Sequence, residues 1–151
     1  MEGITVIVVM FVLIIMAVAG NKIYNNVNDE LQSDDDFSNS SKNLLNDKTK
    51  QYPQIFDGVF IFLLVGMWIT SLAFAYFIDT TPILFVVSII LLIIILIIGA
   101  IISNAYIELT EEETFNSAPT DFPISYFIMS HLVETLIAIV LSITIVLFAK
   151  N

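Results

Sequence analysis

The sequence predicts an all-α fold, a polytopic integral membrane protein with four transmembrane helices and a central tight helical hairpin. The main observation is a run without charge: no charged residue lies between Asp79 and Glu108, and the only hydroxyl in residues 82–102 is Ser88. The chain of 151 residues is also 58% hydrophobic and only 13% charged. A bilayer core is about 30 Å thick and about 20 helical residues cross it. The uncharged run is therefore predicted to be a membrane span.

We expect a single membrane domain over residues 1–151, with spans at about residues 4–20, 56–78, 82–103 and 124–149. Two polar loops, residues 21–55 and 104–123, separate these spans, and the third helix is expected to continue towards Glu108. The first span ends in Ala17-Val18-Ala19-Gly20, which has the small residues of a signal-peptidase site. Its preceding residues are acidic rather than basic, unlike a secretory signal. We therefore expect a retained helix, and a cleaved signal is the alternative.

The second and third spans are joined by Asp79-Thr80-Thr81-Pro82. Asp79 is expected to act as a turn or cap residue, and Thr81 to cap the next helix. Pro82 fits the first turn of a helix, where its missing N–H would be unpaired in any case. These residues predict the central hairpin turn. Within the second span, Gly66 is small enough to let a neighbouring helix approach, and Trp68 is expected to pack between helices.

The polar stretch of residues 21–55 has a weaker helical pattern. Ile23, Val27 and Leu31 are four residues apart, which predicts one stripe of a helix that continues out of the first span. A second helical segment would include Phe37, Leu44 and Leu45 and would be limited by Pro53. The stretch is therefore expected to be a solvated helical hairpin or a loose loop.

The composition excludes several function classes. There are 15 acidic residues against 5 basic ones, with no arginine, so direct contact with nucleic acid is not expected. There is no cysteine and one histidine, which leaves few ligands for a metal site. The acidic runs 34–36 and 111–113 lack the spacing of a calcium loop. No nucleotide-binding loop or nucleophile motif is present, so we predict neither an enzyme, nor a cofactor, nor a metal.

One polar pair and one acid lie within or beside apolar segments. His131 and Glu134 are three residues apart, which would place them on one face of a helix. An ionisable pair inside a membrane is a candidate proton relay; if the apolar core begins near Leu132, the pair is instead interfacial. Asp57, at the start of the second span, is expected to be an interfacial carboxylate near a helix N-terminus.

Four spans would place both termini on one side of the membrane and both polar loops on the other. Three lysines close to span ends lie on the loop side and one on the terminal side: Lys22, Lys48 and Lys50 against Lys150. Because positive residues favour the cytoplasm, we expect cytoplasmic loops and external termini.

Several short motifs resemble a known group of proteins. They are Phe56-Asp57, the turn at residues 78–83, Ser103-Asn104-Ala105-Tyr106, Phe122-Pro123 and Met129-Ser130-His131. Together they resemble small membrane proteins of environmental single-stranded-DNA phages, both membrane-containing icosahedral and filamentous. The resemblance covers about residues 56–148. It implies a minor-coat-protein-like structural role in the virion or the host inner membrane, with no catalytic residue.

These observations lead to three hypotheses. The first is a structural or assembly membrane protein, whose partners would be the bilayer, copies of itself and other coat proteins. The second is a small accessory subunit of a cellular membrane complex. The third is a small ion or proton transporter that uses His131 and Glu134.

Overall fold

The computed structural model describes residues 2–34, 36–78 and 82–149, and within these residues it is helical without any strand. The all-α prediction is confirmed. The helices are α1 (Glu2–Ser33), α2 (Asn39–Phe77), α3 (Pro82–Glu111), α4 (Ala118–Asp121), α5 (Pro123–Ser130) and α6 (Leu132–Ala149).

Three to four of these elements are candidate membrane spans. Three helical segments are long and apolar enough to cross a bilayer: Ile4–Ser33, Asn39–Phe77 and Val86–Glu111. The pair Pro123–Ser130 and Leu132–Leu147 passes the same test jointly, with a bend of 78° between its two parts. The described chain is thus compatible with an integral membrane protein.

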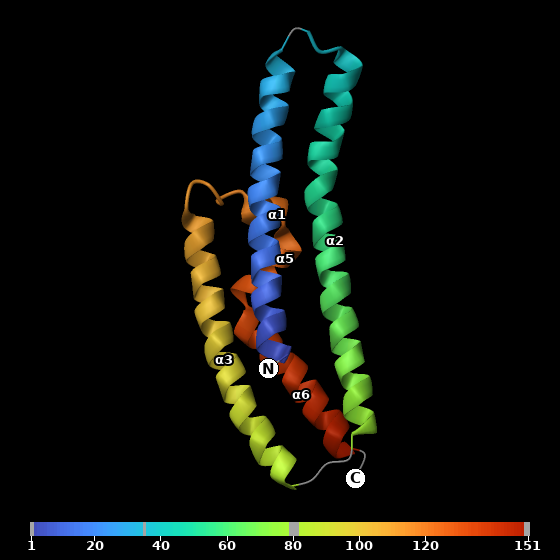
Figure 1. Cartoon of the computed structure of the whole chain (residues 1–151), viewed down its shortest axis with the longest axis vertical. Helices are drawn as coiled ribbons and strands as arrows, with labels where there is room; N and C mark the ends of the chain where they lie inside the picture. Colours follow the sequence, from blue (N-terminus) through green and yellow to red (C-terminus); the bar gives the residue numbers. More distant parts are fainter. Residues whose placement is uncertain (1, 35, 79–81, 150–151) are drawn as a thin grey trace.

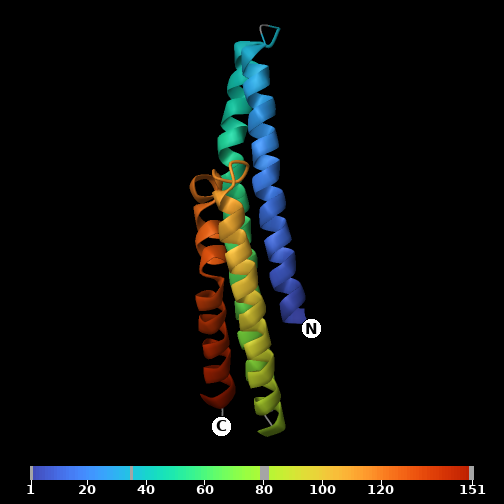
Figure 2. The ribbon, with the colours of Figure 1, turned by 90° about the vertical axis from the view of Figure 1, so that its left-hand side faces the viewer.

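The two longest helices form an antiparallel pair that extends beyond the rest of the molecule (Figure 1). Both α1 and α6 pack against α2 and α3. The first residues of α1 and the last residues of α6 point towards the same end of the bundle, and α1 begins short of the end that α3 and α6 reach (Figure 2). The polar α1–α2 connection and the α3–α4 connection both lie on the opposite side.

Residues 21–55 form a helical hairpin, which is one of the two alternatives expected from the sequence. We call these residues the polar hairpin. Near its tip, the Gln32 Nε2 donates to the Lys42 carbonyl at 2.7 Å, and the Lys42 Nζ donates to the Gln32 carbonyl at 2.9 Å. Ser38 caps α2, because its Oγ accepts from the Ser41 N–H at 3.3 Å. These contacts fix the register of the two helices.

The expectation that Pro53 limits the second helical segment is wrong, because α2 passes through Pro53 without a break. A proline inside a helix removes one backbone hydrogen bond and usually kinks or ends the helix. Here Pro53 is buried at the base of the polar hairpin. Tyr52 and Phe56 on either side contact the same buried ring, that of Phe122. The packing of these two rings against Phe122 offsets the backbone hydrogen bond that the helix loses at Pro53.

The predicted fourth span, residues 124–149, is helical but bent. The chain leaves helical geometry at His131, which has φ −116° and ψ 37° and separates α5 from α6. At this break the carbonyl of Ser130 accepts a hydrogen bond from the Ser103 Oγ of α3 at 3.0 Å. The predicted loop 104–123 is largely helical as well, since α3 continues to Glu111 and α4 follows.

The predicted hairpin turn lies partly outside the described residues, which omit Asp79 and Thr81. On either side of it, α2 ends at Phe77 with Ile78 as its C-cap, and α3 begins at Pro82. The role of Pro82 as a first helical residue is therefore as expected. The turn itself stays a prediction.

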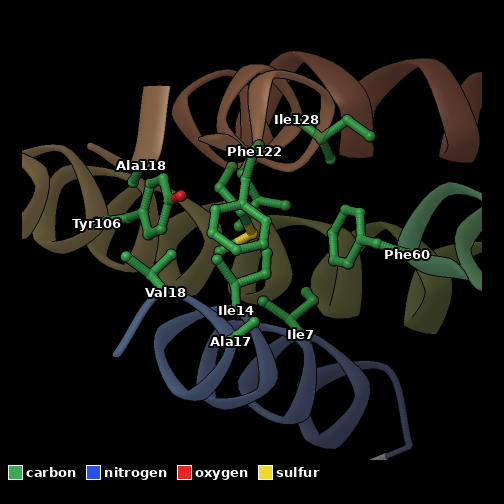
Figure 3. Close-up of a cluster of buried hydrophobic side chains, with 11 residues drawn as sticks. Ile7, Ile14, Ala17, Val18, Phe60, Tyr106, Ala118, Phe122 and Ile128 are labelled. Carbon is green, nitrogen blue, oxygen red and sulfur yellow. The ribbon is translucent and has the colours of Figure 1, made fainter. Parts of the chain in front are cut away.

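The buried core lies where α1, α3 and the α4–α5 segment meet (Figure 3). Its largest fully buried hydrophobic side chains are Tyr106, Phe122, Ile14 and Met129. Most of the remaining apolar side chains on α2 and α3 are exposed on the surface of the isolated chain. An apolar outer face around a small core is typical of a helix bundle that contacts lipid.

The closest helix approach differs from the one expected. A Cβ atom built on Gly66 would meet nothing within 4 Å, whereas one on Gly99 would lie 2.7 Å from the Leu136 Cδ1 of α6. The small residue that permits close packing is therefore Gly99. Trp68 does pack between helices as expected, and its Nε1 donates to the Ser142 Oγ of α6 at 2.8 Å.

We predict that Gly99→Val disturbs the packing of α3 against α6, because the side chain of Leu136 would have to move away from the added methyl groups. Overpacking of this kind costs about 1–3 kcal/mol. Thermal unfolding of the purified protein in mild detergent should show this loss of stability as a lower melting temperature. Gly66→Val is the matched control, and an equal loss in both variants would contradict the proposed contact.

Candidate functional site

Asp57 occupies the most constrained polar position among the described residues. It lies on α2 and is only 3% exposed. Its Oδ2 accepts the backbone N–H of Ile124 at 2.8 Å, and its Oδ1 accepts the backbone N–H of Ser125 at 2.9 Å. The Ser125 Oγ also donates to Oδ1, at 2.5 Å. One carboxyl group therefore receives three hydrogen bonds from the start of α5.

The geometry follows from the sequence at the start of α5. The first N–H groups of a helix have no partner within the helix, and they are normally capped by a nearby Ser, Thr, Asp or Asn. The residue at the N-cap here is Phe122, which makes no side-chain cap, and Pro123 follows it at the first helical position. Asp57 supplies the missing acceptor from another helix, and its negative charge also suits the helix dipole.

The expectation that Asp57 lies at the start of its own helix is wrong. It does lie near a helix N-terminus, but that helix is α5, which is 67 residues away in the sequence from Asp57. Its own helix, α2, begins far earlier, at Asn39. The available sequence signal was Phe122-Pro123, a helix start without a cap residue of its own.

Aromatic side chains surround this capping contact. The ring of Phe122 meets Phe56 edge to face at 5.6 Å and Tyr52 at 6.5 Å. On the far side, Tyr106 is in edge contact with Phe11 at 6.5 Å and in tilted contact with Tyr126 at 6.1 Å. Such pairs add stabilisation beyond their buried area. They shield the hydrogen bonds of Asp57 and hold α5 against α2 and α3.

The structure places His131 and Glu134, the polar pair singled out in the sequence, at the junction of α5 and α6 and in the first turn of α6. His131 stacks on the Phe127 ring at 4.7 Å, and its Nδ1 lies 3.0 Å from the Ser130 Oγ and 3.1 Å from the Phe127 carbonyl. Glu134 is exposed in the first turn of α6. In the described chain the pair has the geometry of two helix-end residues.

Within residues 2–34, 36–78 and 82–149, no group of three or more His, Cys, Asp or Glu side chains lies close enough to hold a metal ion. Asp57 is already engaged by the start of α5.

The polar hairpin exposes apolar side chains outside the apolar part of the chain. On α1, Ile23 is 65% exposed and Val27 is 47% exposed, and on α2, Leu44 is 64% exposed. The stripe predicted from the spacing of Ile23 and Val27 is thus present but faces outward. Phe37, between the two helices, is exposed as well. We call Ile23, Val27, Phe37 and Leu44 the hairpin surface.

The base of the polar hairpin is tied to the segment between α3 and α5. The Lys22 Nζ donates to the carbonyl of Glu113 at 2.9 Å, and the Asn21 Nδ2 donates to the Asp121 Oδ2 at 2.8 Å. Together with Asp57, these contacts join the polar hairpin to the bundle. The hairpin surface is consequently held at a defined angle to the apolar helices.

Comparisons of the chain with protein-family models, curated proteins and solved structures give no match. The two features available are the Asp57 cap, which fixes the bundle, and the hairpin surface, which the bundle presents.

We predict that Asp57→Ala lowers the free energy of unfolding by about 2–3 kcal/mol, because the buried N–H groups of Ile124 and Ser125 lose their acceptor. Denaturant unfolding in detergent, followed by circular dichroism, would measure the change. Asp57→Asn keeps one acceptor oxygen and should lose less.

The matched control for this prediction is Asp47→Ala, which removes an exposed carboxyl from the same helix. Surface changes of this kind usually stay within about 0.5 kcal/mol. If Asp57→Ala were as harmless as Asp47→Ala, the capping role of Asp57 would be wrong.

Proposed function

We propose that this chain is a structural or assembly protein that anchors in a membrane and presents the polar hairpin to partner proteins. The observation that supports the proposal is the continuity of α1 and α2, which run from the apolar part of the chain to the hairpin tip without a break. A rigid projection fits protein contact better than catalysis. The resemblance of residues 56–148 to phage membrane proteins favours a virion, or the host inner membrane where it assembles, as the setting.

The proposed topology has four spans, with α5 and α6 together forming the fourth. The direction of the helices agrees with this arrangement, since α1 begins and α6 ends towards the same end of the bundle (Figure 1). Residues 79–81 would form the tight turn between the second and third spans. Lys22, Lys48 and Lys50 favour a cytoplasmic position for the polar hairpin.

The hairpin surface supports contact with protein rather than lipid. Ile23, Val27 and Leu44 are exposed among polar and charged neighbours, where lipid tails would not cover them. Exposed apolar residues rimmed by polar ones are typical of protein interaction sites. The outer faces of α2 and α3 would contact lipid or further copies of the chain. Assembly would thus use the membrane for position and the polar hairpin for recognition.

We predict that a photo-crosslinking amino acid at Leu44 forms an adduct with a partner protein in cells that produce the assembly. The matched control is the same amino acid at Ile90, which is 55% exposed on α3 and should capture lipid. With the photo-crosslinking amino acid at Val27 instead, Leu44→Asp should abolish the protein adduct and reduce assembly at least about tenfold, since a desolvated charge costs more than 1.4 kcal/mol. The proposal fails if Leu44→Asp assembles normally and no adduct forms at Leu44, Val27 or Ile23.

The same experiment separates the structural proposal from its alternative. An adduct with a coat protein would support a role in virion assembly. An adduct with a resident membrane complex would support an accessory subunit of a cellular complex. Both outcomes keep the polar hairpin as the contact surface and differ only in the partner.

One observation favours transport as a second candidate function. The 78° bend between α5 and α6 is a helix break within an apolar segment, and broken helices frequently line the substrate sites of transporters. His131 lies at that break, and Glu134 lies one turn further on.

If the chain moves protons, liposomes that contain it should show a pH change in an enclosed dye when a gradient is applied. Glu134→Gln should then abolish the flux, because the amide cannot exchange a proton. Glu30→Gln, on the polar hairpin, is the control and should leave the flux unchanged. Absence of flux in the unaltered protein, or equal flux in Glu134→Gln, would exclude this function.

A further inference from the structure

A polar groove of about 660 Å³ lies at the base of the polar hairpin. Pockets that bind small molecules commonly have volumes of roughly 300–1,000 Å³. The groove is separate from the Asp57 cap and from the hairpin surface. It is rich in amide side chains, and its lining includes Asn21, Asn25, Asn28, Asp29, Lys50 and Asp121.

Two acceptor atoms in the lining are buried without a hydrogen bond. Asn21 is 1% exposed, and its Nδ2 is engaged by Asp121 at 2.8 Å, but its Oδ1 has no partner within the described chain. The Oδ1 of Asn25, one turn further along α1, is in the same condition. A buried acceptor left unpaired costs about 1–3 kcal/mol. Both residues line the groove and both unpaired atoms are oxygens, so an occupant that reached them would have N–H or O–H donors.

The charged residues of the lining indicate which charges the occupant would have. Asp29 and Asp121 add carboxyl groups to the unpaired amide oxygens, whereas Lys50 contributes one ammonium group. A small zwitterion would satisfy both signs, with its cationic end at the oxygens and its anionic end at Lys50. A simple anion would meet the two carboxyl groups, and a simple cation would meet Lys50.

The position of the groove matches the zone of lipid headgroups. The apolar run of α1 ends at Gly20, and the groove lining on α1 begins with the next residue, Asn21. The apolar run of α2 starts at Ile55, and the groove lining on α2 ends with the residue before it, Gln54. The headgroup regions extend the bilayer from about 30 Å to about 40–45 Å in thickness. The groove therefore opens at the depth where a headgroup would lie.

We propose that this groove binds the zwitterionic headgroup of a phospholipid that has a primary ammonium group, of the phosphoethanolamine type. Its three N–H donors would engage the Oδ1 atoms of Asn21 and Asn25 together with the neighbouring carboxyl groups. Its phosphate would pair with Lys50. A trimethylammonium headgroup has no N–H to donate, and a glycerol headgroup has no cation. This inference does not depend on the proposed function.

The test uses the full-length protein in mild detergent and native mass spectrometry with three lipids of identical acyl chains. The headgroups are phosphoethanolamine, phosphocholine and phosphoglycerol. The protein should bind the phosphoethanolamine lipid with at least about tenfold higher affinity than either other lipid, which corresponds to about 1.4 kcal/mol of binding free energy. Soluble phosphoethanolamine at high concentration should displace it.

Two pairs of variants locate the binding. Lys50→Gln should weaken retention of the phosphoethanolamine lipid about tenfold, and Lys48→Gln, outside the groove lining, should not. Asn25→Leu should weaken it as well, and the exposed Asn26→Leu should not. Thermal unfolding of each variant would show that the fold is retained.

Equal retention of all three lipids would overturn the proposal, as would a loss that is the same in Lys48→Gln and Lys50→Gln. Putrescine serves as a soluble amine without phosphate. If putrescine displaced the lipid as well as phosphoethanolamine did, and Lys50→Gln had no effect, recognition would be of the amine alone and the phospholipid assignment would be wrong.

Discussion

The hydrogen bonds between Asp57 and the start of α5 are the contact on which the rest of the structure depends. The sequence at Phe122-Pro123 starts a helix without capping it, and Asp57 of α2 supplies the acceptor. This contact places Phe122 between Tyr52 and Phe56. It also sets the position of α4, through which the polar hairpin is tied to the bundle. A charged group can remain buried here because the helix start satisfies it.

The fixed α5 in turn determines where the fourth apolar segment can run. Ser103 of α3 donates to the Ser130 carbonyl at the point where α5 ends, and Trp68 of α2 donates to Ser142 further along α6. Between these two contacts α6 approaches α3 closely at Gly99. The bend at His131 lets α5 satisfy Asp57 while α6 packs against both α2 and α3.

Sequence reasoning was right where one property of a long segment dominates. Long uncharged runs predict helices, because an apolar segment in lipid must pair its backbone N–H and C=O groups within itself. The four-residue spacing of Ile23 and Val27 correctly indicated that α1 continues past its apolar part. The same reasoning was wrong at Pro53 and at His131, because it used only the conformational preferences of neighbouring residues. Packing of Tyr52 and Phe56 keeps α2 continuous at Pro53, and contacts with α3 accompany the break at His131.

By itself the sequence determined an all-helical chain with apolar segments of membrane-spanning length, because hydrophobicity and helix periodicity act over neighbouring residues. Only the tertiary structure decided which helix start Asp57 caps, which glycine allows close packing and which way the hairpin surface faces. Those features join residues far apart in the chain, 67 positions in the case of Asp57 and Ile124. They depend on the direction in which each side chain points once the helices have packed, which no local pattern encodes. The groove, with the unpaired Oδ1 atoms of Asn21 and Asn25, belongs to this second class.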